Sequence, residues 1–358
     1  MSAAGASLNA GTTPVRPGFD LNKVALARWM EDHIADFKGP ITVAQFKGGQ
    51  SNPTYKVTTP HRAYVLRRKP PGPLLQGAHA IEREAEVMSK LADAGFPAPR
   101  VYGLCTDESV IGSRFYVMEM VEGRIFWDCT IPGVPREERA ALFDAMNDTI
   151  ARLHRFDYAA VGLAEFGRTG NYFKRQLARW SRQYRDDRDA GREPELDRII
   201  AWLEDNMPSG GETRLVHGDF RIDNMIFHPT EPRVLAVLDW ELSTLGHPGA
   251  DFTYHAMMYH MPSDIVAGLR GVAVDALGVP SEADYLQAYC RRTGRSAMPD
   301  YDYGLAFNFF RLAAIFHGIK GRVIRGTAVS PYAKERASKL QILVELCRQK
   351  VERASRRL

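Results

Sequence analysis

The segment HGDFRIDN places a carboxylate at Asp219 and a side-chain amide at Asn224, five positions apart on a short polar stretch. Two apolar runs follow, and the second ends in another carboxylate at Asp239. Phosphoryl transfer needs a carboxylate that orients and deprotonates the attacking hydroxyl, and hard oxygen ligands that hold Mg²⁺ against the phosphates. This spacing can supply both, because it has the layout of a catalytic loop followed by a metal-binding aspartate.

A purely structural interpretation competes with this one. The loop that holds Asp219 and Asn224 could simply close a turn, and Asp239 could cap the end of a strand. The tripeptide HGD alone would favour that interpretation. The complete set, in which a hairpin returns the second aspartate, favours phosphoryl transfer.

A family resemblance appears in the same residues. HGDFRIDN followed by VLDWE resembles the aminoglycoside phosphotransferase and choline-kinase-like family, and GHPGADF at residues 246–252 is similar to the segment that follows the metal aspartate there. The resemblance covers nearly the whole chain after the N-terminal arm. The stretch VLRRKPPGPLLQGAHAIEREAEVM is similar to a subgroup that occurs alone in bacteria or fused to acyl-CoA dehydrogenases.

The resemblance implies a role for each matching residue. Asp219 corresponds to the catalytic base, and Asn224 and Asp239 correspond to the metal ligands. His217 matches the residue that braces the catalytic loop, a role that a structural histidine would also fill. Glu241 lies beside the expected metal site and is not assigned as a ligand.

A glycine-rich turn lies between two expected strands at residues 46–52. Gly48 and Gly49 would let backbone N–H groups approach phosphate oxygens, with Ser51 beside them. A Gly-Gly hairpin turn is the ordinary alternative, and the segment lacks the G-x-G-x-x-G pattern of protein kinases.

The third expected strand supplies the cation that kinases place against the phosphates. Arg67 lies two residues beyond Val65, so both side chains share one face of the strand, and Val65 would face the adenine. Arginine keeps the charge but is not interchangeable with lysine. Lys69 is the alternative on the same face. Arg68 fits a solvated strand end.

A helix and a connector complete the expected nucleotide site. The family layout favours Glu84 as the partner of the strand cation, with Glu82 and Glu86 as alternatives on other helix faces. Backbone groups around Glu119 and Val121 would contact the adenine.

The surrounding pattern predicts an α+β, bilobal, protein-kinase-like fold. We expect a flexible arm over residues 1–18, and a nucleotide-binding lobe over 19–121 with an antiparallel sheet and one helix at 79–94. A helical lobe over 122–358 would carry the catalytic loop and the hairpin. Within the first lobe, Asp20 would cap a helix that runs to residue 37, because apolar residues recur there at helical spacing.

Composition excludes several other classes of protein. The 358 residues are 45% hydrophobic and 25% charged, with a formal charge of +4. The four cysteines are scattered, which argues against zinc and against a disulfide framework. We find no nucleic-acid recognition motif, no apolar run long enough to span a membrane and no signal peptide, and therefore expect a cytoplasmic protein.

The sequence thus predicts an ATP- and Mg²⁺-dependent kinase that acts on a hydroxyl of a small molecule. The subgroup resemblance points to a hydroxyacyl-CoA thioester. The alternatives are a choline-, homoserine- or aminoglycoside-kinase-like activity, or a nucleotide-binding protein without catalysis. A basic group after a long apolar helix, at Lys320, Arg322 and Arg325, could meet an anionic part of the substrate, although a core helix with a solvated end is the simpler interpretation.

Overall fold

The computed structural model describes residues 11–47, 52–70, 80–328, 330 and 332–356. This described part of the chain divides into two compact units. The N-terminal unit consists of the described residues within 1–127, 158–166 and 222–243, and the C-terminal unit consists of those within 128–157, 167–221 and 244–358. The division differs from the single boundary expected after residue 121, because the hairpin at 222–243 makes its contacts with the N-terminal unit.

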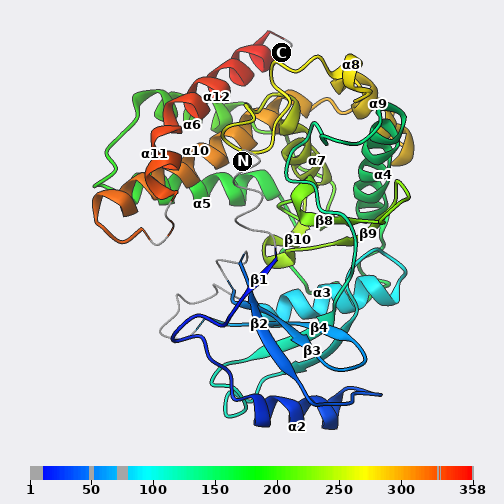
Figure 1. Cartoon of the computed structure of the whole chain (residues 1–358). Helices are drawn as coiled ribbons and strands as arrows, with labels where there is room; N and C mark the ends of the chain where they lie inside the picture. The colour runs from blue at the N-terminus through cyan, green and yellow to red at the C-terminus, as the bar shows by residue number, and fades with distance from the viewer. Residues whose placement is uncertain (1–10, 48–51, 71–79, 329, 331, 357–358) are drawn as a thin grey trace. The chain divides into compact units, whose positions relative to one another are not determined.

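Within the described residues, the N-terminal unit holds a six-stranded antiparallel sheet in the order β1-β2-β3-β4-β6-β5 (Figure 1). Its strands are β1 (Thr12–Thr13), β2 (Thr42–Phe46), β3 (Thr54–Thr58), β4 (Ala63–Arg68), β5 (Val101–Cys105) and β6 (Phe115–Glu119). The expected arm therefore contributes a short edge strand, in which Thr12 pairs with Phe46 and Thr13 with Gln45.

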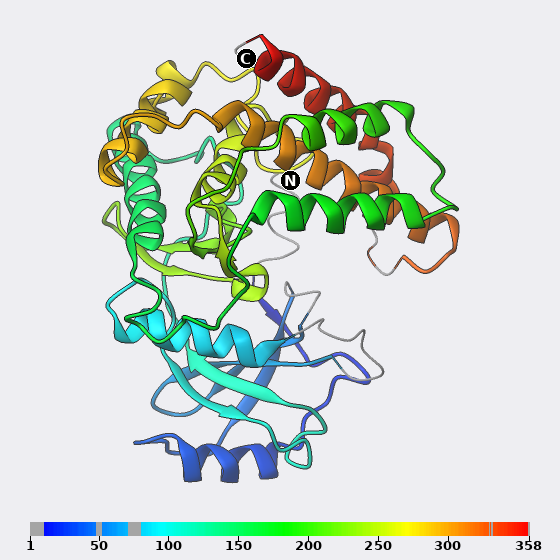
Figure 2. The ribbon, with the colours of Figure 1, turned by 180° about the vertical axis from the view of Figure 1, so that it is seen from behind.

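The two faces of the sheet have different tasks, and β4 shows how the sequence separates them. Tyr64 and Leu66 are fully buried in an apolar cluster with helix α2 (Lys23–His33). Val65 and Arg67 alternate with them and therefore face the other side, where helix α3 (Ile81–Asp93) lies. Figures 1 and 2 show α2 and α3 on opposite faces of the sheet.

Helix α2 closes the apolar face. Its N-terminal cap is Asn22, whose side chain accepts a hydrogen bond from the Ala25 N–H, so the expected cap at Asp20 is corrected by two positions. Trp29 lies at the centre of the buried stripe, with its ring 4.8 Å from that of Phe115. A methyl group on Gly103 would come within 2.9 Å of the indole, so this position of β5 must lack a side chain.

The predicted hairpin is present in the N-terminal unit. A 3-10 turn, η1 (Ile222–Asn224), leads into β8 (Met225–Phe227), which pairs with β9 (Val234–Val237). The hairpin is attached to the rest of the unit by a hydrogen bond from the Val237 N–H to the Pro97 carbonyl, 2.8 Å long. The Trp240 ring, in η2 (Trp240–Leu242), contacts Phe96 edge-on at 5.9 Å.

The described part of the C-terminal unit is built around α10 (Tyr301–Ile324), which is buried along most of its length because apolar and small residues occupy nearly every face. Against it pack α5 (Tyr172–Asp186), α6 (Pro194–Asp205), α7 (Pro248–Ala256), η3 (Met257–Tyr259), α11 (Ala333–Ser338) and α12 (Leu340–Ser355). Helices α4 (Arg136–Arg155) and α9 (Glu282–Arg292) pack against each other, and the unit also contains α8 (Val274–Leu277). No helix in the described ranges is long and apolar enough to cross a membrane.

One strand pair in this unit was not predicted. The short strand β7 (Arg214–Val216) pairs antiparallel with β10 (Thr244–Gly246). Each strand has only three residues, which is too short for an alternating pattern to be visible in the sequence. The pair matters because HGD follows directly after β7 and GHPGADF begins at the end of β10.

The packing of α2 generates a stability prediction. Trp29→Ala should lower the free energy of unfolding of the N-terminal unit by roughly 3–5 kcal/mol, because it leaves a large cavity against the sheet. Val24→Ala, on the same helix but 76% exposed, should change it by no more than about 0.5 kcal/mol. Urea unfolding followed by circular dichroism would measure both, and equal effects would contradict this packing.

Candidate active site

A cavity of about 280 Å³ lies entirely within the N-terminal unit. Several of the predicted site residues line it: Val65, Arg67, Glu84, Glu119, Val121, Asn224 and Asp239. Apolar side chains form much of the remaining wall, among them Met88, Met118, Ile125, Ile226 and Leu238. An apolar cavity with a few converging charged groups has the character of a small-molecule site.

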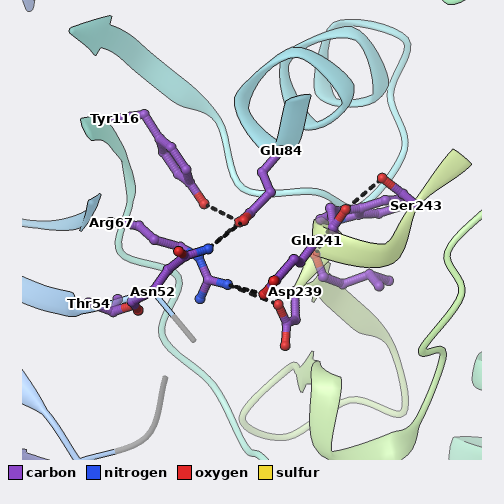
Figure 3. Close-up of polar contacts among 10 residues, drawn as sticks. Asn52, Thr54, Arg67, Glu84, Tyr116, Asp239, Glu241 and Ser243 are labelled. Atoms are coloured by element: carbon purple, nitrogen blue, oxygen red, sulfur yellow. Dashed lines mark hydrogen bonds and ion pairs between the residues drawn. The ribbon is translucent and has the colours of Figure 1, made fainter. Parts of the chain in front are cut away.

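Arg67 is the centre of the charged part of this cavity (Figure 3). Its Nε atom lies 2.8 Å from Glu84 Oε2, and its Nη2 lies 3.0 Å from Asp239 Oδ1 and 3.7 Å from Glu241 Oε2. Burial opposes the charge on the guanidinium, but the neighbouring acidic groups raise the pKa of Arg67 above its usual value. Arg67 is therefore a buried cation held by acidic groups from two other elements.

The neighbouring basic residues lie elsewhere. Lys69, the alternative to Arg67, instead pairs with Glu82 at 2.9 Å, and Glu82 also accepts from Arg114. Arg68 is only 4% exposed, so its expected position at a solvated strand end is wrong. Its side chain points to the apolar face and reaches the Ile111 carbonyl at 3.5 Å, as the alternation of β4 requires.

Glu84 is 2% exposed, and both its carboxylate oxygens have partners (Figure 3). The Asn52 amide donates to Oε1 at 2.9 Å, and the Tyr116 hydroxyl donates to Oε2 at 3.1 Å. Burial raises the pKa of Glu84 to about 7, while Arg67 opposes the rise. Sequence analysis did not predict these contacts of Asn52 and Tyr116 with Glu84, because each joins residues 32 positions apart.

The hairpin brings the two predicted metal ligands together. The Leu238 N–H donates to the Asn224 carbonyl at 2.8 Å, so Asp239 directly follows the residue paired with Asn224. Asp239 has a positive φ of 65°, which few residues other than glycine adopt. Such strained conformations concentrate at functional sites.

These donors suit Mg²⁺ bound together with a nucleotide. Among the described residues, no group of three or more His, Cys, Asp or Glu side chains could hold a metal by itself. Protein sites usually bind Mg²⁺ through one or two carboxylates, with substrate phosphates and water filling the other positions. One carboxylate and one amide beside an arginine fit that pattern.

His217 and Asp219 belong to the C-terminal unit, and the division between units falls after Arg221. The fully buried His217 ring accepts a hydrogen bond from the Asp219 N–H through Nδ1, at 3.1 Å. Gly218 between them has φ 82°, a conformation that favours glycine. The histidine thus fixes the turn that presents Asp219.

A buried aspartate anchors this loop from below. Asp251, on α7, accepts the backbone N–H of His217 through Oδ2 and that of Gly218 through Oδ1, each at 2.8 Å. His154 Nε2 lies 3.1 Å from Oδ2. Burial would raise the pKa of Asp251, but the hydrogen bond and charge of His154, with His217, hold it below its usual value.

The Asp219 carboxylate is itself positioned by two side chains. The Tyr254 hydroxyl donates to Oδ1 at 2.6 Å, and Arg221 Nε lies 3.2 Å from the same oxygen. Tyr254 follows Asp251 by three positions on α7, so both face the loop. The three-residue spacing of Asp251 and Tyr254 could have predicted that both contact the loop, but the sequence analysis did not include it.

The other expectations have plain outcomes. Gly48, Gly49 and Ser51 lie outside the described residues. Of the basic group, which occupies the C-terminal end of α10, Lys320 lies 3.2 Å from Glu193, and Arg325 lies 2.6 Å from Asp187 and 2.9 Å from Asp189. Both cations are therefore already engaged with acids of the C-terminal unit.

Comparison with known proteins shows which family this chain resembles. The model of a family described as "Phosphotransferase enzyme family" matches residues 42–303. Acyl-CoA dehydrogenase family member 10 of Mus musculus is 42% identical over 338 residues, which cover 94% of this chain and 32% of that protein. Acyl-CoA dehydrogenase family member 11 of Gallus gallus is 42% identical over 345 residues, 94% of this chain and 44% of that protein. The chain thus spans less than half the length of these relatives.

Solved structures agree with this result. A protein of Ralstonia eutropha assigned to the aminoglycoside phosphotransferases superposes with a TM-score of 0.85 at 46% identity, covering 93% of this chain and 99% of that one. A choline kinase of Cryptosporidium parvum superposes with a TM-score of 0.59 at 12% identity, covering 93% of this chain and 97% of that one, and at this identity it shows the fold alone. The predicted fold class and family resemblance are confirmed.

The loop anchor generates a prediction. Asp251→Asn should lower the free energy of unfolding of the C-terminal unit by about 3–5 kcal/mol, because an amide cannot accept from both backbone donors and His154. Exposed Asp264, which pairs with Lys339, provides the control: Asp264→Asn should cost no more than about 1 kcal/mol.

The difference in free energy of unfolding between wild type and Asp251→Asn should depend on pH. The folded-state pKa of Asp251 is lowered, so its stabilisation is complete above the unfolded value of about 3.9 and is lost as pH falls through the folded value. Urea unfolding should therefore show the gap between wild type and Asp251→Asn narrowing below about pH 4. A gap that widened in acid would contradict this account.

Proposed function

Since the chain belongs to the phosphotransferase enzyme family, we propose that it transfers the γ-phosphoryl group of ATP, with Mg²⁺, to a hydroxyl of a small molecule. The observation that carries this proposal is the cavity in which Arg67 meets Glu84 and Asp239. In kinases, a strand cation paired with a helix glutamate binds the phosphates, and a nearby aspartate binds the metal ion. Arg67, Glu84 and Asp239 are arranged in this way.

Different parts of the cavity would hold the adenine, the phosphates and the metal ion. Val65 and Met118 offer an apolar wall to the adenine, and the backbone from Glu119 to Val121 offers polar groups beside it. Arg67 would neutralise phosphate charge, while Asn224 and Asp239 would hold Mg²⁺. When bound, Mg²⁺ offsets the charge of the phosphate oxygens and aligns them for transfer.

Asp219 is the proposed base. Its carboxylate would accept a hydrogen bond from the acceptor hydroxyl, orient it and take its proton as the new P–O bond forms and the bond from the γ-phosphorus to the departing ADP breaks. Tyr254 and Arg221 keep the carboxylate in one orientation, and Asp251 keeps the loop in place through its backbone. Catalysis then consists mainly of positioning and electrostatic stabilisation.

The proposed acceptor is a hydroxyacyl-CoA, for example a 4-hydroxyacyl-CoA. Support comes from the relatives, whose names are those of acyl-CoA dehydrogenase family members and which contain a segment similar to this chain. The alternatives are choline, homoserine or an aminoglycoside. Arg67 in place of the usual lysine keeps one further alternative, a nucleotide-binding protein without turnover.

The first experiment incubates the protein with Mg·ATP and a pooled acceptor panel, and detects products by mass spectrometry. The panel contains hydroxyacyl-CoAs, free hydroxy acids, choline, homoserine and aminoglycosides. We expect one acceptor to gain a phosphate, and Asp219→Asn to reduce that rate by roughly a hundredfold or more. Asp264→Asn is the matched control. ATP binding without product would favour the non-catalytic alternative, and absent ATP binding would refute the kinase.

Nucleotide binding gives a second, independent prediction. Asp239→Asn should abolish most of the increase in ADP affinity caused by Mg²⁺, because it removes a charged ligand. Arg67→Met should weaken ADP binding with and without Mg²⁺, by on the order of tenfold. Lys69→Met should leave ADP affinity unchanged, since Lys69 pairs with Glu82. Titration calorimetry measures all three, and identical losses for Arg67→Met and Lys69→Met would contradict the assignment.

A further inference from the structure

Arg311 lies inside α10, the helix around which the C-terminal unit is built, and is only 6% exposed. Within the described residues its guanidinium forms no ion pair with a carboxylate. Its Nη2 donates to the Gly218 carbonyl at 2.8 Å, and its Nε has no hydrogen-bond partner among those residues. Burying a charge with so few partners is costly, and an apolar side chain of similar volume would often be more stable there. The contacts that Arg311 does make therefore need an explanation.

The first contact fixes the peptide group that leads into the proposed base. The Gly218 carbonyl and the Asp219 N–H belong to the same planar peptide. Arg311 holds the oxygen of this peptide, and His217 Nδ1 accepts from its N–H at 3.1 Å. The preceding N–H, that of Gly218, donates to Asp251 at 2.8 Å. The direction in which the Asp219 side chain leaves the backbone is therefore set from both α7 and α10.

The second contact fixes the far end of the same side chain. The guanidinium of Arg311 lies over the Tyr254 ring, 4.8 Å from its centroid, and the hydroxyl of that ring donates to Asp219 Oδ1 at 2.6 Å. The Trp180 ring, on α5, lies 5.8 Å from the same guanidinium. A cation is attracted to an aromatic face within about 6 Å of the ring centre. Arg311 thus restrains the ring that holds the carboxylate as well as the backbone that carries it.

We propose that Arg311 is a positioning residue for phosphoryl transfer, because one guanidinium fixes both the backbone and the carboxylate of Asp219. It acts through Gly218 and Tyr254 and does not contact the reacting atoms. The inference rests on the proposed function, in which Asp219 is the base. A guanidinium is planar, so it can donate to a carbonyl in its plane while its face packs on a ring, whereas the ammonium of a lysine has no such plane. The geometry therefore requires an arginine, and a positive charge alone would not be sufficient.

A misplaced base should affect the chemical step more than nucleotide binding. ATP would bind in the cavity of the N-terminal unit, whereas Arg311 and its partners belong to the C-terminal unit. Arg311→Lys should therefore lower kcat by roughly ten- to a hundredfold and change the KM for ATP by no more than about twofold. Arg198→Lys is the matched control and should change neither, because Arg198 is exposed on α6 and pairs with Glu195 of its own helix.

Hydrogen exchange measures the hold on the loop without any substrate. The N–H groups of His217, Gly218 and Asp219 are all hydrogen-bonded, so their exchange rates report opening of the loop. In Arg311→Lys we expect these rates to rise by roughly tenfold, while the amides of α10 stay as protected as in wild type. Faster exchange in α10 alone, or unchanged exchange in the loop, would overturn the inference, because Arg311 would then serve only the packing of its helix.

A second variant covers the case in which a buried lysine destabilises the whole unit. Arg311→Gln has no charge to bury, and its side chain ends two bonds short of the Nη2 atom that donates to Gly218. It should reproduce the faster loop exchange and the lower kcat while α10 stays protected. Wild-type loop exchange and wild-type kcat in Arg311→Gln would overturn the inference as well.

A double-mutant cycle tests the link through Tyr254. Tyr254→Phe keeps the ring but removes the hydroxyl that donates to Asp219, and it should itself lower kcat. In that background the carboxylate has already lost the hydrogen bond that Arg311 supports, so Arg311→Lys should cause a smaller fold-loss of kcat than in wild type. Fully additive losses would show that Arg311 and Tyr254 act independently, and would overturn the proposed link.

Exchange and kinetics together separate this inference from the proposed function. If the wild type phosphorylates no acceptor of the panel, the kinase proposal fails, and loop exchange in Arg311→Lys still decides whether Arg311 holds the loop. If an acceptor is phosphorylated and Arg311→Lys keeps the wild-type kcat, the positioning role fails and the kinase proposal stands.

Discussion

The N-terminal unit depends on the guanidinium of Arg67, a positive charge buried between the sheet and α3. A buried cation that lacks enough backbone acceptors needs acids to balance its charge, and β4 itself carries none. Glu84 comes from α3 and Asp239 from the end of the hairpin, so a single ion-pair network ties the helix and the hairpin to β4. Asn52 and Tyr116 then complete the hydrogen bonding of Glu84. The ion pairs of Arg67 thus hold these three elements together and also place the charged groups of the candidate site.

Much of this unit could be predicted from the sequence because its signals are local. Alternation along β4 separates Val65 and Arg67 from the apolar-face residues, and helical spacing together with closing Gly95 delimits α3. The hairpin followed from two apolar runs around a proline-flanked turn. Asp239 could be placed after its second strand for the same reason. Its left-handed backbone could not, since nothing in the residue type announces it.

The parts that could not be predicted are held by contacts between distant segments. Asp251 binds the loop of His217 through backbone groups, so no side-chain pattern records the pairing. The hairpin belongs to the N-terminal unit through Pro97 and Phe96, more than a hundred positions earlier in the chain. Arg311 is a further case. In the sequence it only interrupts the apolar pattern of a helix, whereas in the structure its guanidinium donates a hydrogen bond to the Gly218 carbonyl of the catalytic loop.

The N-terminal unit is assembled from three separated stretches of chain, and this has a consequence for synthesis. At about 5–20 residues per second, the ribosome needs on the order of ten seconds to extend the chain from Trp127 to Ser243. During that interval the nascent sheet and α3 exist without the hairpin, and Arg67 has Glu84 but not Asp239. The N-terminal unit therefore cannot complete its fold until the hairpin has been synthesised. A fragment ending at Trp127 would expose the apolar surface that Trp240 and the hairpin normally cover.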